Sequence, residues 1–230
     1  MKKHILLIGG SHGIGHELIQ KLVGEHQITV ASRTRPELES EDLTYIPFDA
    51  TTDVLDPTQL PETIHGFAFL PGSINLKPFK MLSTESFYEA MELNFFAMVK
   101  VLKTVLPRMA EGSSMLFFST VAVTTGMPFH SSIAAAKGAV EGFVKSMAAE
   151  YAPKIRFNAI APSLVDTPLA SRLLGNDRKK ELMAARHPMK RYGHPEEIAE
   201  LASFLLRDQS SWVTGQIIGI DGGMSTLNVN

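Results

Sequence analysis

The stretch of sequence that decides the fold reads Ile8-Gly9-Gly10-Ser11-His12-Gly13-Ile14-Gly15. It follows an apolar run directly and opens a segment whose apolar residues Leu18, Ile19 and Leu22 recur at helical spacing. Glycines in a GxxxGxG pattern let the backbone turn tightly and approach a pyrophosphate, towards which the helix N-terminus points free N–H groups. A strand before and a helix after are the context that such a loop requires. The stretch therefore predicts a phosphate-binding turn of a dinucleotide site, formed by Gly9, Ser11, His12, Gly13, Ile14 and Gly15.

The rest of the chain alternates short apolar runs with longer segments of helical period. The strand candidates are Ile5–Ile8, Ile28–Ala31, Leu43–Pro47, Gly66–Leu70, Ser114–Ser119, Ile155–Ile160 and Gln216–Ile220, and the helix candidates are residues 14–24, 84–110, 131–152 and 195–206. Near-continuous apolar strands that alternate with helices are typical of a parallel sheet covered on both faces. The sequence therefore predicts one α/β domain over residues 1–230, a three-layer Rossmann fold with a doubly wound parallel sheet of about seven strands and helices on both faces.

Composition excludes several classes of function. The formal net charge is −2, and the basic residues are scattered, so the clustered basic surface that nucleic acid requires is not expected. The chain has no cysteine, which excludes disulfides, thiolate metal sites and a cysteine nucleophile, and none of its eight histidines forms an HExxH or similar ligand pair. No stretch approaches the roughly 20 apolar residues that cross a bilayer. We therefore expect a cytoplasmic protein that binds no metal, membrane or nucleic acid.

The end of the second strand candidate indicates which dinucleotide is bound. Ile28–Ala31 is followed by Ser32-Arg33-Thr34, where NAD-preferring Rossmann sites carry an acidic residue for the ribose hydroxyls. An arginine at this point can bind a 2′-phosphate instead. Arg33 thus favours NADP over NAD, and the alternative is a solvated arginine in a loop that also contains Arg35.

Residues 163–192 form the least regular part of the chain. Prolines and glycines interrupt this segment, and five basic side chains lie within it: Arg172, Arg178, Lys179, Lys180 and Arg186. Such a segment predicts a mobile helical excursion that covers the substrate site as a lid. The alternative is a pair of solvated surface helices.

The chain resembles the short-chain dehydrogenases/reductases over essentially its full length. The glycine loop, Leu93-Asn94-Phe95, Ala134-Ala135-Ala136-Lys137, Ile160-Ala161-Pro162 and Asp221-Gly222-Gly223 occur in the family's order and spacing. The resemblance implies an oxidoreductase with a nicotinamide cofactor, whose adenine would contact Asp49 and whose carboxamide would be held by Thr167. The cofactor site that it implies also includes Ala50, Gly72, Asn94, Lys137 and Pro162.

The resemblance breaks at the catalytic segment. Lys137 matches the lysine of the family's YxxxK motif, but position 133, one helical turn earlier, is isoleucine. Thr120 stands where the family has its catalytic serine, and Asn94 matches the asparagine that holds a relay water. The implied catalytic residues are therefore Asn94, Thr120 and Lys137. Two further departures are Phe69-Leu70-Pro71-Gly72, and Pro162-Ser163 where the family has Pro-Gly.

Three functions remain open from the sequence. An NADP-dependent enzyme acting on a small carbonyl or alcohol would need a substitute for the tyrosine, such as water, His130 or Tyr192. A non-catalytic NADP(H)-binding protein would instead act as a sensor or partner subunit, because isoleucine transfers no proton. A relative that catalyses a different reaction is the third.

Apolar residues on two predicted helices point to self-association. The segment from Phe87 to Met109 carries them on more than one face, and the following helix combines Gly138 and Gly142 with Phe143. One sheet covers only one face of each helix, so the other faces would be exposed in a monomer. The family usually pairs these helices across a two-fold axis. We therefore expect a homo-oligomer, a dimer or more readily a tetramer.

Overall fold

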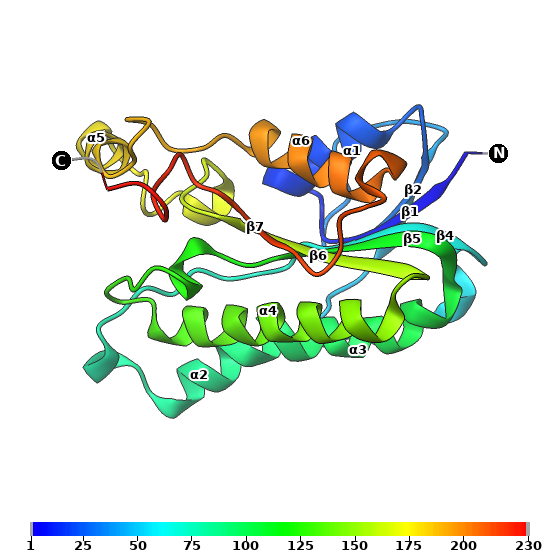
Figure 1. Cartoon of the computed structure of the whole chain (residues 1–230), viewed down its shortest axis with the longest axis horizontal. Helices are drawn as coiled ribbons and strands as arrows, with labels where there is room; N and C mark the ends of the chain where they lie inside the picture. The colour runs from blue at the N-terminus through cyan, green and yellow to red at the C-terminus, as the bar shows by residue number, and fades with distance from the viewer. Residues whose placement is uncertain (1, 229–230) are drawn as a thin grey trace.

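The computed structural model describes residues 2–228 and contains one parallel sheet of seven strands, in the order β3-β2-β1-β4-β5-β6-β7 (Figure 1). The strands are β1 (His4–Ile8), β2 (Gln27–Ser32), β3 (Leu43–Pro47), β4 (Ile64–Phe69), β5 (Met109–Phe118), β6 (Ile155–Pro162) and β7 (Ile217–Ile220). The central strands are buried on both faces, which is why they read as continuous apolar runs. The predicted fold class is confirmed.

Helices cover both faces of the sheet. The helices are α1 (Gly13–Leu22), α2 (Thr84–Met91), α3 (Ala97–Val105), α4 (Ser131–Tyr151), α5 (Asp177–Ala185) and α6 (Pro195–Leu206). In Figure 1, α1 and α6 lie above the sheet and α3 and α4 lie below it. Each pair encloses its own apolar core against the strands, one around Leu18 and Leu205 and the other around Val101 and Val140. The three layers are thus held by two separate cores.

The order of the strands places a binding site at one edge of the sheet. The chain runs outward from β1 through β2 to β3, and then crosses back to place β4 on the other side of β1. Ligands of doubly wound sheets bind outside the carboxyl ends of the strands, at the point where the strand order reverses. Here that point lies between the ends of β1 and β4, beside the glycine loop.

The predicted helix over residues 84–110 is wrong in two respects. It is interrupted by a π-helical turn at Glu92–Phe96, and it ends at Val105, after which the chain makes a 3-10 turn at Leu106–Arg108. Pro107 within that turn has no N–H to continue the helix. Strand β5 accordingly begins at Met109, five residues before the strand candidate, and a register shift opposite Ile64 and Gly66 accommodates the extra length.

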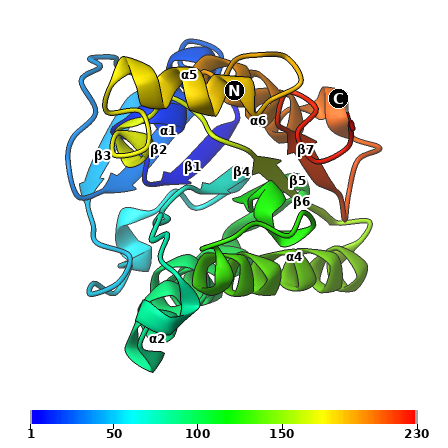
Figure 2. The same cartoon turned by 90° about the vertical axis from the view of Figure 1, so that its left-hand side faces the viewer.

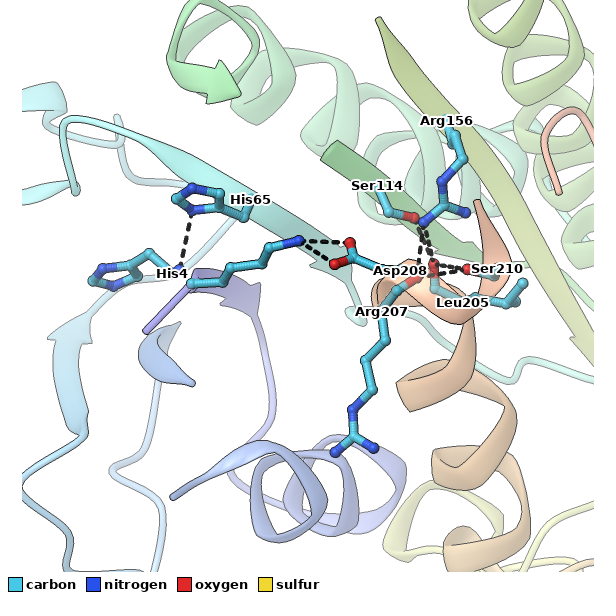
Figure 3. A network of polar contacts seen from close by, with 9 residues as sticks. His4, His65, Ser114, Arg156, Leu205, Arg207, Asp208 and Ser210 are labelled. Carbon is cyan, nitrogen blue, oxygen red and sulfur yellow. Dashed lines mark hydrogen bonds and ion pairs between the residues drawn. The ribbon is translucent and has the colours of Figure 1, made fainter. Parts of the chain in front are cut away.

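A polar network closes the amino-terminal end of the sheet. Figure 3 shows Arg156 and the hydroxyls of Ser114 and Ser210 meeting at the carbonyl of Leu205, to which they donate at 3.1, 2.6 and 3.0 Å. This carbonyl belongs to the last turn of α6, whose final carbonyls have no partner within the helix. The guanidinium thus fixes the end of α6 to strands β5 and β6, far from the carboxyl edge where the site lies.

Residues 163–192 leave the sheet at the end of β6 and return beside their own starting point. They contain a 3-10 turn at Pro168–Ala170 and helix α5, and they close at a bridge between Val165 and Gly193. Figure 2 views the molecule from the side on which α5 lies. The excursion therefore has the position of a lid, and its mobility stays a prediction.

Candidate functional site

A pocket of about 1140 Å³ lies at the carboxyl ends of the strands, between the glycine loop and the excursion. It collects the predicted residues from seven parts of the chain: Gly9, Ser11, His12, Gly13, Ile14, Gly15, Arg33, Asp49, Ala50, Gly72, Thr120, Lys137, Pro162 and Thr167. Asn94 is absent from its wall. These residues share one pocket although they lie up to 158 residues apart, from Gly9 to Thr167, and their binding of a cofactor stays a prediction.

The glycine loop meets the steric requirements of a phosphate-binding turn. A Cβ on Gly15 would lie 2.3 Å from the Cα of Gly10, so the backbone crosses itself where no side chain fits. Gly13 has a φ of +55°, and a Cβ there would approach the Thr167 side chain to 3.1 Å. His12, the N-cap of α1, makes no side-chain hydrogen bond to the first turn, which leaves its N–H groups free for an anion.

Two polar side chains fix the loops beside the glycine turn. Thr34 donates a hydrogen bond to the Ser11 hydroxyl at 2.7 Å, which joins the end of β2 to the glycine loop. Asp49 accepts from the N–H and the hydroxyl of Thr51 at 2.9 and 2.6 Å. These two bonds, with a smaller effect of the nearby Arg33 charge, lower the pKa of Asp49. Arg33 itself is exposed at the mouth of the pocket, where a phosphate could reach it.

Lys137 lies at the centre of the opposite wall. It is buried, and burial lowers the pKa of its ammonium to about 8. A Cβ added to Gly72 would lie 3.5 Å from the Lys137 Nζ and 3.3 Å from the Asn94 Oδ1, so the absence of a side chain at position 72 makes room for both polar groups. Ile133, one helical turn before Lys137, lines the same pocket.

Thr120 stands beside this wall with its hydroxyl free to donate. Its Oγ1 accepts a hydrogen bond from the N–H of Ala122 at 3.3 Å, within the 3-10 turn Val121–Val123. The preceding Ser119 donates to the buried carboxylate of Glu141 at 2.5 Å. Sequence reasoning missed this pair, although Glu141 lies one turn beyond Lys137. The bond fixes the segment that carries Thr120 to helix α4.

Asn94 acts on the pocket from behind its wall. It lies in the π-helical turn and donates to the Ala90 carbonyl at 2.8 Å and to the Ser73 hydroxyl at 3.1 Å. Its Oδ1 accepts from the Ser73 N–H at 3.4 Å. The wider π turn is a common device at functional sites, and here it carries an amide that holds the loop after β4. Asn94 thus supports Gly72 and Ser73 from behind the pocket wall, and its predicted role at the cofactor and in catalysis stays a prediction.

Of the two side chains considered as substitutes for the tyrosine, His130 and Tyr192, only the first lines the pocket. His130 lines the pocket, with its Nδ1 2.7 Å from the carbonyl of Pro128. Tyr192 lies outside the lining residues and packs against His194, with ring centroids 6.0 Å apart. Ser163 and His187 also line the pocket and were not predicted. Ser163 could have been identified from the sequence, because it replaces the glycine of the family's Pro-Gly turn.

Within residues 2–228, no group of three or more acidic or histidine side chains could hold a metal ion. Over the same residues, no helix combines the length with the apolar character that crossing a membrane requires.

Replacing Lys137 by methionine should stabilise the protein at neutral pH. Folding lowers the pKa of this amine from 10.5 to about 8, so the unfolded chain binds the proton more tightly and stability falls as the pH drops from 10.5 through 8. We expect Lys137→Met to raise the free energy of unfolding at pH 7 by up to about 3 kcal/mol, measured by urea denaturation, and by less at pH 10. The exposed Lys145 of the same helix supplies the control, because Lys145→Met should change stability by less than about 0.5 kcal/mol. Equal effects of both substitutions would contradict the prediction.

Comparison with known proteins agrees with this geometry. The family model described as enoyl-(acyl carrier protein) reductase matches residues 58–225. The chain is 36% identical to a 3-oxoacyl-(acyl-carrier-protein) reductase of Thermotoga maritima, over 62% of this chain and 58% of that protein. It is 30% identical to a tropinone reductase homolog of Arabidopsis thaliana, over 96% and 74% of the two chains. A short chain dehydrogenase family protein from Francisella tularensis has the same fold, with a TM-score of 0.90 at 26% identity over 99% and 100% of the chains. The chain therefore belongs to the short-chain dehydrogenase/reductase family, a family of oxidoreductases that use nicotinamide cofactors.

Proposed function

We propose that this protein transfers a hydride between NADP(H) and a small carbonyl or alcohol substrate, in a catalytic site altered by Ile133. The observation that carries the proposal is the single pocket that joins the glycine loop and Arg33 to Thr120 and Lys137. Its volume of about 1140 Å³ exceeds the usual range of small-molecule sites, about 300–1,000 Å³, and suits a dinucleotide with a small substrate beside it.

The residues present fit the cofactor. The side-chain-free crossing at Gly10 and Gly15 and the uncapped first turn of α1 suit a pyrophosphate, and Arg33 suits a 2′-phosphate. Asp49 and Ala50 would contact the adenine, while Asn94, Lys137, Pro162 and Thr167 would hold or support the nicotinamide end. When bound, the nicotinamide supplies the hydride chemistry that these side chains lack.

Two side chains would act on the substrate carbonyl. The Thr120 hydroxyl accepts from Ala122, so its own hydrogen remains free to donate to the carbonyl oxygen. The buried Lys137 places positive charge near the same end of the pocket, where it opposes the negative charge that develops on that oxygen. Ile133 presents only methyl and methylene groups and transfers no proton. The proton must therefore come from another group.

Much of the rest of the pocket wall is apolar, and we propose that this part receives the substrate. Its lining residues there include Ile74, Leu76, Val121, Met127, Phe129, Leu169, Leu173 and Met183. Several of these belong to the excursion 163–192, which we propose to act as the substrate lid. Apolar walls favour a carbonyl compound with alkyl or aryl substituents over a sugar, whose hydroxyls would lack partners.

Ile133 also supports a second candidate function. A chain that kept the cofactor site and lost its proton donor would bind NADP(H) without turnover and act as a sensor or partner subunit. The two candidates share the cofactor and differ in whether the pocket reduces a carbonyl.

The preference for NADPH should depend on Arg33. We expect NADPH to bind with micromolar affinity or better, more tightly than NADH, when each is titrated by calorimetry. Arg33→Ala should weaken NADPH about tenfold to a hundredfold, the value of a charge-assisted hydrogen bond, and leave NADH unchanged. The matched control is Arg35→Ala, because Arg35 is also exposed and lies outside the pocket lining. Equal affinities of the unsubstituted protein for both cofactors would overturn the assignment.

A tyrosine at position 133 should restore the usual proton donor. Ile133→Tyr places a phenol one turn from Lys137. If the unsubstituted chain has no positioned general acid, NADPH-dependent reduction of an aryl dione should rise by about 10²–10⁴, the usual contribution of such an acid; if another side chain already donates the proton, the increase should be small. Ile133→Phe adds the same ring without the hydroxyl and should give no increase. Rates are followed by the loss of NADPH absorbance. Intact NADPH binding with no turnover in the unsubstituted protein and in both variants would favour the non-catalytic function.

We also propose that the protein is a homo-oligomer, a tetramer rather than a dimer. Tyr88 in α2 and Phe96 at the end of the π-helical turn are 68% and 45% exposed, although both are large and mainly apolar. Light scattering at micromolar concentration should give a multiple of the 25.2 kDa chain. Phe96→Glu should reduce that mass, whereas Val54→Glu, in a loop after β3, should leave it unchanged. The monomer mass for the unsubstituted chain would refute the proposal.

A further inference from the structure

A serine and a histidine form a hydrogen-bonded pair in the wall of the pocket. Ser163 follows the last residue of β6, and its Oγ lies 2.9 Å from the Nε2 of His187. The serine is partly exposed to the pocket, whereas the histidine is only 2% exposed. The hydroxyl therefore stands in front, and the imidazole lies behind it.

The backbone sets the tautomer of this imidazole. The Nδ1 of His187 lies 2.8 Å from the carbonyl of Met183, and a carbonyl can only accept, so Nδ1 carries the hydrogen. In the neutral ring, Nε2 is then an acceptor for the Ser163 hydroxyl. A nucleophile or acid whose basic partner is oriented by a third group is the arrangement that proton transfer requires. Gly222 packs against the same histidine and leaves room for its ring.

The pair stands next to the group that would orient the substrate. Strands β5 and β6 are paired with Phe118 opposite Ile160, and the Ser119 N–H donates to the Ile160 carbonyl at 2.7 Å. Thr120 lies two residues beyond the end of β5, and Pro162 is the last residue of the neighbouring strand β6. Ser163 is the next residue, and it opens into the same pocket as Ile133.

We propose that Ser163 is the proton donor of this site and that His187 acts through it, in place of the family's tyrosine. This inference rests on the proposed function. In the reduction, the carbonyl carbon gains a hydride from the dihydronicotinamide and the C=O π bond breaks. The carbonyl oxygen takes the proton of the Ser163 hydroxyl, and Ser163 takes a proton from the Nε2 of the imidazolium of His187. Before the step, solvent in the open pocket supplies that proton to His187 through the partly exposed Ser163 hydroxyl, and oxidation of an alcohol reverses each transfer.

The partner imidazole makes the serine a competent donor. A serine hydroxyl alone holds its proton too tightly near neutral pH, whereas imidazole exchanges protons readily there. The carbonyl of Met183 stabilises the charged ring by accepting from Nδ1. The inference also connects two departures from the family pattern, Ile133 and Ser163, since the second supplies what the first removes.

A purely structural role for the pair makes different predictions. If the bond only anchored the excursion to β6, its loss would weaken substrate binding and stability, whatever residue occupied position 133. If the pair donates the proton, its loss lowers kcat and matters little once a phenol is present. The experiment therefore measures Ser163→Ala and His187→Gln in the unsubstituted chain and in Ile133→Tyr. His26→Gln is the matched control, because His26 also contacts the carbonyl four residues earlier, Leu22 at 3.3 Å, and lies outside the pocket.

With NADPH and phenylpropanedione, we expect Ser163→Ala and His187→Gln each to lower kcat about a hundredfold. KM, the affinity for NADPH and the melting temperature should change little, and Ser163→Thr should keep most of the rate. In the Ile133→Tyr background the same substitutions should lower kcat less than threefold. A loss of the same size in both backgrounds, or no loss in the unsubstituted chain, would overturn the inference while leaving the proposed function intact.

Nitrogen NMR of the histidine rings tests the pair without cofactor or substrate. The resonance that His187→Gln removes should show a protonated Nδ1, and its Nε2 signal should shift in Ser163→Ala. A ring with the other tautomer, or one unaffected by Ser163→Ala, would contradict the arrangement. Unimpaired NADPH binding without dione reduction in every variant would overturn the proposed function, and this inference with it.

Discussion

The site depends on one close backbone contact, the crossing of Gly15 over Gly10. A Cβ at position 15 would lie 2.3 Å from the Gly10 Cα, a distance that no side chain tolerates. This crossing turns the chain from β1 into α1 within a few residues and brings the helix against the sheet, where Leu18 and Ile19 join the core of β1 and β2. The same turn aims the uncapped start of α1 along the carboxyl edge. The packing of one core layer and the orientation of the phosphate site thus follow from a single steric condition.

At the other end of the pocket, the burial of Lys137 lowers the free energy of unfolding. Lys137 is buried where its charged form is poorly solvated, which is why its pKa falls to about 8. Glu141, one turn further along α4, is also buried, but the Ser119 hydroxyl hydrogen-bonds it. A helix with apolar residues at positions 137 and 141 would pack more favourably. Functional sites are where such costs are tolerated, so the poorly solvated cation beside Gly72 and Asn94 supports the binding role proposed for Lys137.

Local sequence patterns predicted those features of the fold that are set by residues close together in the chain. The strand runs, the glycine loop and the end of β2 are set by hydrophobic period and backbone sterics, and the structure confirms the strands and the fold. The π turn around Asn94 could not be predicted from hydrophobic periodicity. The Asn94 side chain bonds to Ala90 and to Ser73, and the bond to Ser73 is a tertiary contact that the local pattern does not show. The early start of β5 was missed for the same reason, since strand length there depends on pairing with β4. Ser163 and His187 lie 24 residues apart and meet only because the excursion folds back on β6.

The path of that excursion gives the proposed chemistry a property that the tyrosine arrangement lacks. A phenol at position 133 would sit on α4, a helix whose position is fixed by the core. His187 instead follows α5 directly, and its Nδ1 bonds to Met183 within that helix, whereas Ser163 belongs to the end of β6. The donor therefore exists only while the excursion lies against the sheet. On the proposed mechanism, the segment that encloses the substrate also completes the proton path, so that closure and chemistry depend on the same hydrogen bond.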